Sequence, residues 1–403
     1  MPNDYYAPEF DVTIRDAPLP PALRRVISSV SFTTGLEGAD RVEAAVANQA
    51  LEWLDDPLLA LGNAFRLGMG YAPKAVVPVF AGEITGVGAS FPSSGVPQLT
   101  VMAQDRRHRM QQGVQARWHS DPRPNFGNLP QDDQKVTQEV AREYDLQVTI
   151  DPVGAGLARV IAAATAGLAT DADSAQKAVQ RQISESDYDF LRRLARQSGL
   201  EMVIDHTDPN GGRKLRFFSP LDHLDADVDL EYGRSLIEFT PRESNVGQVA
   251  AVTANVWVPA AKKQYGVTLG VRDGEAGLTL AVSPEPARPD DPQDAVVLDE
   301  PLTLATAPRR LVSELMPRLN ALHTGSGSTV GDPCIRAGTV LRLLGLGVRF
   351  GGLYRVTSAT HTIDTGGYRT RFDVRKEIWF NSVPKDSQGA VRLNRPPMIR
   401  VEV

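Results

Sequence analysis

The chain has 403 residues, of which 42% are hydrophobic and 23% charged, so it is long enough for two or three domains with separate cores. Its net charge of −6 argues against a general nucleic-acid or anionic-membrane surface, because such surfaces need clustered Lys and Arg. The lone Cys334 excludes an intrachain disulfide and a thiolate metal cluster.

The N-terminal sequence predicts no secretory signal, because residues 1–6 contain neither a basic region nor an apolar stretch. The longest run of small apolar residues, 160–169, is well short of the ~18 residues that a membrane-spanning helix needs. We therefore expect cytoplasmic synthesis and no direct insertion into a membrane.

The first 113 residues predict a β-rich domain. Six segments alternate apolar and polar residues or are rich in β-branched residues, and Pro and Gly separate them, which is typical of short antiparallel strands. We expect a barrel or sandwich that ends in a short helix at residues 106–113. The predicted strands are 9–15, 26–33, 41–47, 63–69, 76–91 and 99–105.

Residues 114–232 predict an α+β middle domain. Residues 133–144 carry apolar side chains at fourfold spacing, which predicts one amphipathic helix. A second helix is predicted to begin after a Ser184 cap, with Asp187 three residues later, and to end at Gly199. Strands are expected at 201–205 and 214–218, joined by the hairpin signal Pro209-Asn210-Gly211-Gly212.

The second helix has an apolar and a basic face. The apolar residues predict a buried face made of Phe190, Leu191, Leu194 and Ala195. The opposite stripe of Arg192, Arg193 and Arg196 is interpreted as a solvated face, with an interface as the alternative.

Residues 233–380 predict a second β-rich domain with helical and loop insertions. Its expected elements are strands at 236–239 and 249–258, a surface loop at 284–292, a helix at 308–322 and a hairpin at 350–372. Residues 381–403 form the predicted extended C-terminal tail, which usually needs a surface to dock on.

The hairpin at 350–372 is similar to an earlier one. Phe80-Ala81-Gly82 and Phe350-Gly351-Gly352 each open a strand with period-two apolar residues, and a turn containing glycine returns the chain. The pattern indicates either an internal repeat that builds two similar β domains or only the general likeness of any two hairpins.

No motif for catalysis or cofactor binding is complete. Gly345-Leu346-Gly347 and Gly86-Val87-Gly88 lack the third glycine of a dinucleotide-binding loop, so we interpret them as glycines within strands. Gly325-Ser326-Gly327-Ser328 lacks the GxSxG spacing and is interpreted as a flexible loop. The six histidines show no HExxH spacing, which leaves a zinc hydrolase without support.

Residues 225–231 alternate acidic and apolar side chains. Leu230 replaces the glycine of a calcium-binding loop and Leu236 its closing glutamate, so we interpret the segment as a strand with one acidic face. The sequence therefore predicts no catalytic, cofactor-binding or metal-binding residues. A carboxylate pair that only folding brings together, as in glycosidases, stays open.

Four segments in their order and spacing resemble the late control protein D family of phage baseplate hubs, which includes the hub portion of type VI secretion VgrG spikes. The helix segment 185–195 is the most specific of them. The others are 80–86, the 103–110 segment that follows it, and Gly331-Asp332-Pro333 through Ala337-Gly338-Thr339 into the hairpin at 350–372.

The resemblance implies a β-rich α+β fold with two tube-like antiparallel β-barrel domains, 1–113 and 233–380, around the α+β middle domain 114–232. It implies a structural, non-enzymatic homotrimer without cofactors. Three chains would present six barrels around a channel and adapt a hexameric inner tube to a trimeric spike within a baseplate. Phage tails, tailocin-like particles and protein-delivering contractile injection systems all fit this role.

The sequence departs from VgrG chains near its end. VgrG chains continue into an OB-fold and a β-helix, whereas this chain stops soon after Asn381-Ser382-Val383-Pro384. We therefore expect a separate spike protein, with residues 389–403 as a candidate contact. The alternatives are a soluble β-rich hydrolase with a dispersed carboxylate site, or a carbohydrate-binding module with exposed aromatic platforms.

Overall fold

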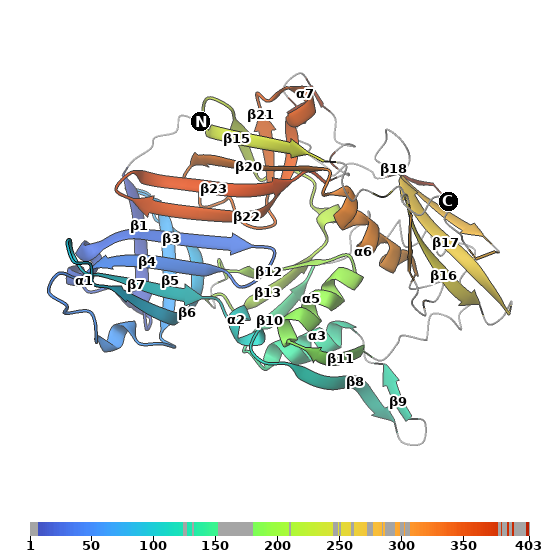
Figure 1. Cartoon of the computed structure of the whole chain (residues 1–403), viewed down its shortest axis with the longest axis horizontal. Coiled ribbons are helices and arrows are strands. Elements are labelled where there is room, and N and C mark those ends of the chain that lie inside the picture. The colour runs from blue at the N-terminus through green and yellow to red at the C-terminus, as the bar shows by residue number, and fades with distance from the viewer. Residues whose placement is uncertain are drawn as a thin grey trace.

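The structure is a computed structural model of the whole chain, and it is rich in strands (Figure 1). No helix among the residues that it describes is long and apolar enough to cross a membrane. The described residues are 7–123, 127–130, 133–151, 180–208, 211–244, 249, 251–258, 262–271, 277–283, 285–286, 295–298, 302, 307–377, 380, 385–386, 389–390 and 400–402.

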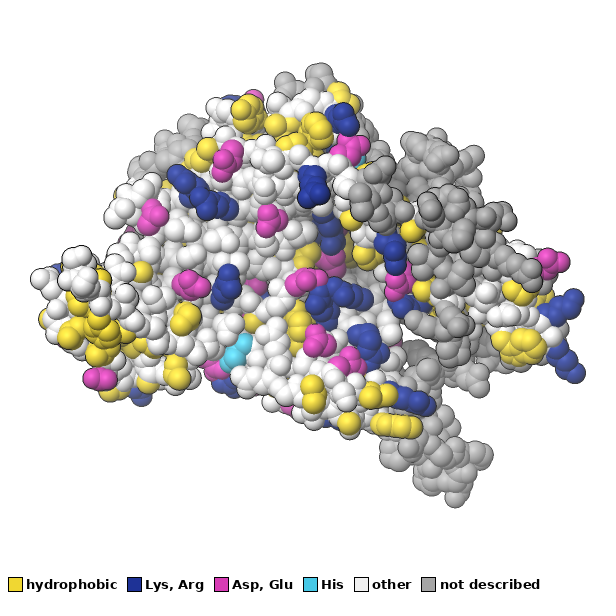
Figure 2. Space-filling model, in the orientation of Figure 1, with side chains coloured by type: hydrophobic (Ala, Val, Ile, Leu, Met, Phe, Trp, Pro, Cys, Tyr) yellow, Lys and Arg dark blue, Asp and Glu magenta, His cyan; other side chains and the backbone are white. Residues whose placement is uncertain are grey.

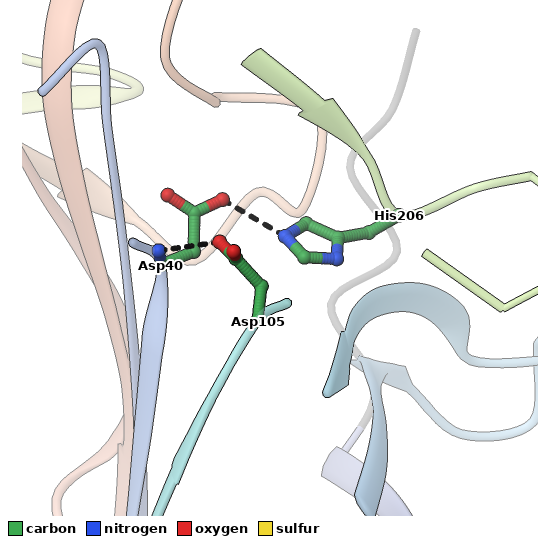
Figure 3. A group of neighbouring side chains, drawn as sticks. All are labelled: Asp40, Asp105 and His206. Atoms are coloured by element: carbon green, nitrogen blue, oxygen red, sulfur yellow. Dashed lines mark hydrogen bonds and ion pairs between the residues drawn. The ribbon is translucent and has the colours of Figure 1, made fainter. Parts of the chain in front are cut away.

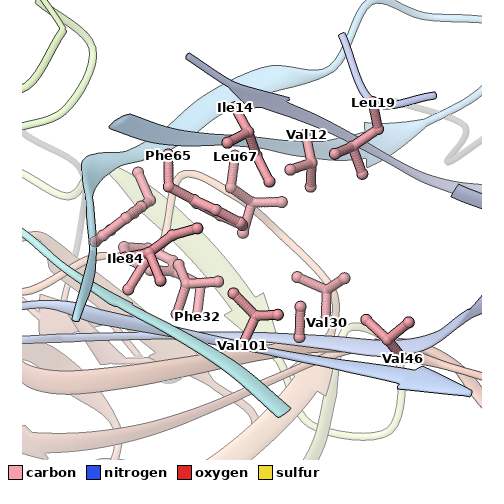
Figure 4. Packing of buried hydrophobic residues seen from close by; sticks show 14 of the residues in the cluster. Val12, Ile14, Leu19, Val30, Phe32, Val46, Phe65, Leu67, Ile84 and Val101 are labelled. Atoms are coloured by element: carbon pink, nitrogen blue, oxygen red, sulfur yellow. The ribbon is translucent and has the colours of Figure 1, made fainter. Parts of the chain in front are cut away.

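Six strands near the N-terminus form an antiparallel sheet in the order β3-β4-β7-β6-β5-β1, which we name the N-terminal sheet unit. The sheet curves so that Val12 and Leu67 lie across the core from Val46 and Val101 (Figure 4). Its elements are β1 (Pro8–Ile14), β2 (Ala17–Pro18), α1 (Pro21–Val26), β3 (Ile27–Gly35), β4 (Arg41–Ala47), η1 (Pro57–Leu59), β5 (Ala64–Tyr71), β6 (Val77–Ser90), β7 (Gln98–Gln104) and α2 (Arg107–Met110).

Six later strands form a second sheet in the order β15-β20-β23-β22-β21-β14, which we name the C-terminal sheet unit. Its apolar residues, among them Leu236, Leu341 and Phe372, make a separate core. Its elements are β14 (Val228–Glu231), β15 (Leu236–Glu243), β20 (His323–Val330), β21 (Val340–Leu344), α7 (Gly347–Phe350), β22 (Gly352–Asp364) and β23 (Gly367–Arg375).

The two units have the same strand order. In chain order β1, β3, β4, β5, β6 and β7 occupy the places of β14, β15, β20, β21, β22 and β23. Bulges occur at matching points, at Ser28 in β3 and Ile237 in β15, and at Thr85 in β6 and Thr357 in β22. One pair differs, because β1 runs antiparallel to β5 whereas β14 runs parallel to β21.

A glycine with positive φ precedes the fourth strand of each unit. Gly62 donates its N–H to the carbonyl of Ile84, and Gly338 donates in the same way to Val356. This register matches Phe80 with Gly352, not with Phe350. The expected equivalence of Phe80-Ala81-Gly82 and Phe350-Gly351-Gly352 was therefore wrong by two residues, because Phe350 ends a helical turn before the strand begins.

The units join edge to edge into one thirteen-stranded sheet. The second half of β22 pairs antiparallel with β3, from Ser358 opposite Gly35 to Ile363 opposite Val30. Figure 1 shows the units stacked, with β22 directly above β3. The first half of β22 pairs on the same edge with β21, so this long strand has two neighbours there.

The middle of the chain packs two helices on a three-stranded sheet, β10-β13-β12, while β8, β9 and β11 form a separate sheet beside them. Its elements are β8 (Gln115–Arg123), β9 (Gly127–Pro130), α3 (Asp133–Arg142), β10 (Gln147–Ile150), β11 (Gln180–Glu185), α5 (Asp187–Gln197), β12 (Glu201–Asp205), β13 (Lys214–Phe218) and η3 (Pro220–Asp222).

Helix α5 begins two residues later than the sequence indicated. The cap is Ser186, whose hydroxyl accepts the N–H of Asp189, and not Ser184. Ser184 instead lies in β11 and has a positive φ. Ser186 has the same three-residue spacing to an acid as Ser184, and the β11 ladder decides between them.

Between β15 and β20 the chain builds a five-stranded sheet, β19-β16-β17-β18-β26, covered by α6. The last strand, β26, comes from the C-terminal tail and pairs parallel with β18, so this part of the tail lies on the chain's own surface. The elements are β16 (Ala251–Val258), β17 (Lys263–Val271), β18 (Gly277–Ser283), β19 (Ala295–Leu298), α6 (Ala307–Leu319), β24 (Lys385–Asp386), β25 (Gly389–Ala390) and β26 (Arg400–Glu402). The predicted surface loop at 284–292 lies mostly outside the described residues.

Two interpretations of glycine-rich segments were wrong. Residues 325–328 belong to β20 and are not a flexible loop, since Gly325 and Gly327 leave room for the rings of Phe239 and Phe372. Gly86 and Gly88 lie within β6 as expected, whereas Gly345, at φ 78°, lies in a bend between β21 and α7 and not in a strand.

Candidate functional site: a buried ionic cluster and two open strand edges

Three titratable side chains converge at one end of the strands of the N-terminal sheet unit (Figure 3). Asp40 precedes β4, Asp105 follows β7, and His206 follows β12 of the middle region. All three are buried, and each is brought into place by the end of a strand. No local spacing in the sequence marks these three residues, because 166 positions separate Asp40 from His206.

Apart from the buried Nη1 of Arg107, the side-chain polar atoms of this cluster have partners among the described residues. The Asp40 N–H donates to Asp105 at 2.6 Å, and the Arg107 guanidinium lies 2.8 Å from both carboxylates. The Ala81 N–H donates to Nδ1 of His206, so Nε2 carries the proton and donates to Asp40 at 2.8 Å.

The two carboxylates of the cluster find a shared cation and hydrogen-bond donors inside the protein. Burial raises the pKa of Asp40, but Arg107 and His206 outweigh burial and leave this pKa below its ordinary value. A divalent cation would have to displace Arg107 and take the lone pair that Ala81 occupies on His206. The cluster is therefore a structural link between the N-terminal sheet unit and the middle region, and it does not fit a metal site.

A second buried cluster links the C-terminal sheet unit to the middle region. Arg355 donates to Glu377 at 2.7 Å and to the carbonyls of Gly338, Pro220 and His223. Burial raises the pKa of Glu377, and Arg355 and Arg375 lower it to below its ordinary value.

Arg375 also pairs with Glu201, the first residue of β12, while His206 follows the last residue of that strand. Strand β12 thus joins both sheet units through its two ends. A middle region fixed in this way holds the two units in one relative position.

Several strand edges of the sheet have no described partner, and two of them belong to the equivalents of the strands that pair at the join, β3 and β22. Among the described residues β15 pairs only with β20, apart from a bridge between Tyr232 and Leu236. On the edge of β6 that β5 occupies up to Glu83, residues 86–90 have no described partner. We name these stretches the β15 edge and the β6 edge.

The polar residues singled out in the sequence have partners within the chain. Arg192 and Arg196 pair with Glu37 in the β3–β4 loop, and Arg193 pairs with Glu185. The basic stripe is therefore an internal contact as well as a solvated surface. In the acidic segment 225–231 only residues 228–231 form a strand, and Asp229 pairs with Arg342.

One cavity of about 540 Å³ lies between α6 and the C-terminal sheet unit. Asp373 is the one carboxylate among its lining residues, which include Arg242 and Arg375. A glycosidase needs two carboxyl groups across the bond that it cleaves. This cavity does not offer such a pair.

Figure 2 shows acidic and basic side chains scattered over the viewed surface.

Comparisons with known proteins place the fold. No family model and no curated protein matches the sequence. The 43 kDa tail protein of prophage MuSo2 from Shewanella oneidensis matches at a TM-score of 0.57 and 15% identity, over 91% of this chain and 98% of that one. A tail protein from Neisseria meningitidis MC58 matches at a TM-score of 0.58 and 11% identity, over 92% of this chain and 97% of that one.

A third match, at a TM-score of 0.54 and 12% identity, covers 96% of this chain and 80% of an E. coli type VI secretion component. That component, the c3393 protein, is described as structurally similar to the T4 bacteriophage tail proteins gp27 and gp5. At these identities the likeness shows a shared fold. The expected β-rich α+β fold is confirmed, and the chain has the fold of phage tail and type VI secretion proteins.

Proposed function

We propose that the chain is the structural baseplate hub of a contractile tail or injection particle. It acts as a homotrimer that adapts the hexameric inner tube to a separate trimeric spike. The observation that carries this proposal is the doubling of the sheet unit, because the two units share one strand order and join edge to edge. The fold shared with tail proteins supports the same role.

The symmetry follows from the doubling. Three chains with two similar units each present six similar units around one axis, while their remaining parts repeat three times. The six units match a sixfold tube, and the threefold parts match a trimeric spike. The role is mechanical. The buried hydrogen bonds that tie the sheet units to the middle region fit a rigid adaptor.

The C-terminal tail is the proposed contact of the spike. Its described end, β26, lies at the edge of the inserted sheet, where its outer side has no partner among the described residues. In particles carrying a chain truncated after Met398, we expect assembled hubs without spike density in electron micrographs. Spike density at the normal level would overturn the tail assignment.

Mass measurement of the purified full-length chain tests the trimer. We expect an assembly of three times the 43.7 kDa of the chain. In purified particles, the chain should lie between tube and spike. A chain that stays monomeric at every concentration, and that lies elsewhere in particles, would overturn the proposal.

A further inference from the structure

The join between the two units inside one chain predicts the join between chains. Within the chain, the second half of β22 pairs with β3. The equivalent of β22 is β6, and the equivalent of β3 is β15. Both equivalents have an open edge among the described residues, so the contact made once inside the chain can be made again between neighbours.

From this equivalence we infer that the β6 edge of each chain pairs antiparallel with the β15 edge of the next chain. The inference rests on the proposed trimer and deepens it by naming the surfaces and their register. The contact is head-to-tail, because every chain offers one edge of each kind, and such contacts close into a ring when the rotation permits.

The bulges fix the register. In the alignment of β6 with β22, the bulge residue Thr85 matches Thr357. In the alignment of β15 with β3, the bulge residue Ile237 matches Ser28. With these two matches, each residue pair observed between β22 and β3 gives the corresponding pair between β6 and β15 of neighbouring chains. Thr360 opposite Thr33 becomes Gly88 opposite Arg242. By the same rule, Ala359 opposite Thr34 becomes Val87 opposite Glu243, and Ile363 opposite Val30 becomes Phe91 opposite Phe239.

Burial supports the inference. Ala359 and Ile363, which lie opposite β3 at the join, are 1% and 6% exposed, whereas their equivalents Val87 and Phe91 are 38% and 61% exposed. Ile363 belongs to the core of the N-terminal sheet unit, to which β22 contributes across the join. Phe91 would contribute in the same way to the core beneath β15 of the next chain.

The backbone of β15 also differs from that of β3 at one point. The Leu36 N–H donates to the carbonyl of Thr357, so the N–H of Phe32, four residues earlier, faces the same strand. Pro241 stands at the position of Phe32 and has no N–H to donate. The new ladder therefore lacks one hydrogen bond, and Pro241 disfavours pairing of this edge with arbitrary strands.

Cysteine pairs in the full-length chain test the register, in a Cys334→Ser background because Cys334 is exposed. Gly88→Cys with Arg242→Cys should form a disulfide between chains, since opposite residues in a non-hydrogen-bonded pair have their Cα atoms about 4.5 Å apart. Within one chain the same positions lie on strands with six others between them.

Two further pairs are controls. Thr33→Cys with Thr360→Cys, whose hydroxyl oxygens lie 3.2 Å apart, should cross-link inside one chain without changing its mass. Ser90→Cys with Arg242→Cys shifts the register by two residues and should give about tenfold less interchain disulfide than the Gly88 pair.

The outcomes separate this inference from the proposed function. Cross-linked trimers with the Gly88 pair, and few with the Ser90 pair, support both. A trimer by mass in which the Gly88 pair does not cross-link would overturn the register and leave the hub assignment standing. A chain that forms neither trimer nor cross-link would overturn both.

A charge at the inferred contact gives an independent test. Phe91→Asp would bury an unpaired carboxylate and should weaken the trimer at least about tenfold. Trp257→Asp, at a residue of similar exposure on the inserted sheet, should leave trimer formation unchanged. Equal effects of the two substitutions would count against the contact.

Discussion

The two sheet units share a strand order but differ in what connects their strands. In the N-terminal sheet unit, residues 36–40 join β3 to β4 directly, whereas residues 244–322 join the equivalent strands β15 and β20 through a whole inserted sheet and α6. The ladder, its two bulges and its positive-φ glycine are the shared parts. The hydrogen-bonded strands are therefore the repeated framework, whereas the segments that connect them differ between the two units.

Replacing a buried arginine should have the largest effect on stability. Arg107 is the cation that pairs with both Asp40 and Asp105, so Arg107→Met leaves two buried carboxylates without it and should lower the free energy of unfolding by about 3–5 kcal/mol. Arg355→Met should lower the free energy of unfolding by less, because Arg375 still lies 2.9 Å from the Glu377 carboxylate. Urea unfolding measures both losses.

Arg192→Ala is the matched control for the arginine variants. Its pair with the exposed Glu37 should contribute about 0–1 kcal/mol. If Arg107→Met cost no more than this control, the buried cluster would not be the link between the N-terminal sheet unit and the middle region.

The join between the units should depend on pH. Burial lowers the pKa of His361 in β22 to about 4, below its usual 6.5. The unfolded chain therefore binds the proton first, and stability falls as the pH drops from about 6.5 towards 4, by about 3 kcal/mol in total from this group.

His361→Gln should flatten this part of the pH profile, measured as the free energy of unfolding between pH 7 and 4. The carboxylate Asp40, whose pKa is lowered below 3.8, loses its contribution only as the pH falls further. The N-terminal sheet unit has Ala89 at the position of His361, so it has no such group. An unchanged slope in the variant would contradict the assignment to His361.

The two units also pack differently at one equivalent position, where a substitution should have a smaller effect on stability. Ala44 of β4 and Gly327 of β20 are equivalent, but a Cβ on Gly327 would lie 2.8 Å from both the Phe372 ring and the carbonyl of Glu238. Gly327→Ala should therefore destabilise the chain by about 1–3 kcal/mol. Thermal unfolding measures it.

Gly88→Ala is the control for Gly327→Ala, because a Cβ there meets nothing within 4 Å in one chain. We expect a change of about 0.5 kcal/mol or less. If both variants lost the same stability, contact with the Phe372 ring would not be the reason for a glycine at position 327.

Much of the ladder could be predicted from the sequence, because alternation of apolar residues is a local signal. The strands of the N-terminal sheet unit and the hairpin β22–β23 were confirmed close to their predicted limits. The predicted helices at 133–144 and 308–322 were confirmed as α3 and α6, and the apolar face of α5 is buried. The domain boundaries at 113, 232 and 380 stay predictions.

Features that depend on distant residues could not be predicted. The cluster of Asp40, Asp105 and His206 has no local spacing, and the glycines of β20 look like a loop until the rings of Phe239 and Phe372 are placed against them. The repeated hairpin was found from its glycines, but its register was not, because the bulge at Thr357 is a property of strand pairing. The same limit applies to the β6 and β15 edges.

A cryo-electron microscopy reconstruction of the assembled hub, calculated without imposed symmetry, would show the arrangement of the six sheet units. We expect three chains whose N-terminal and C-terminal sheet units alternate around one axis, with the β6 edge of each chain against the β15 edge of the next. A ring with like units side by side, or with a number of units other than six, would contradict it.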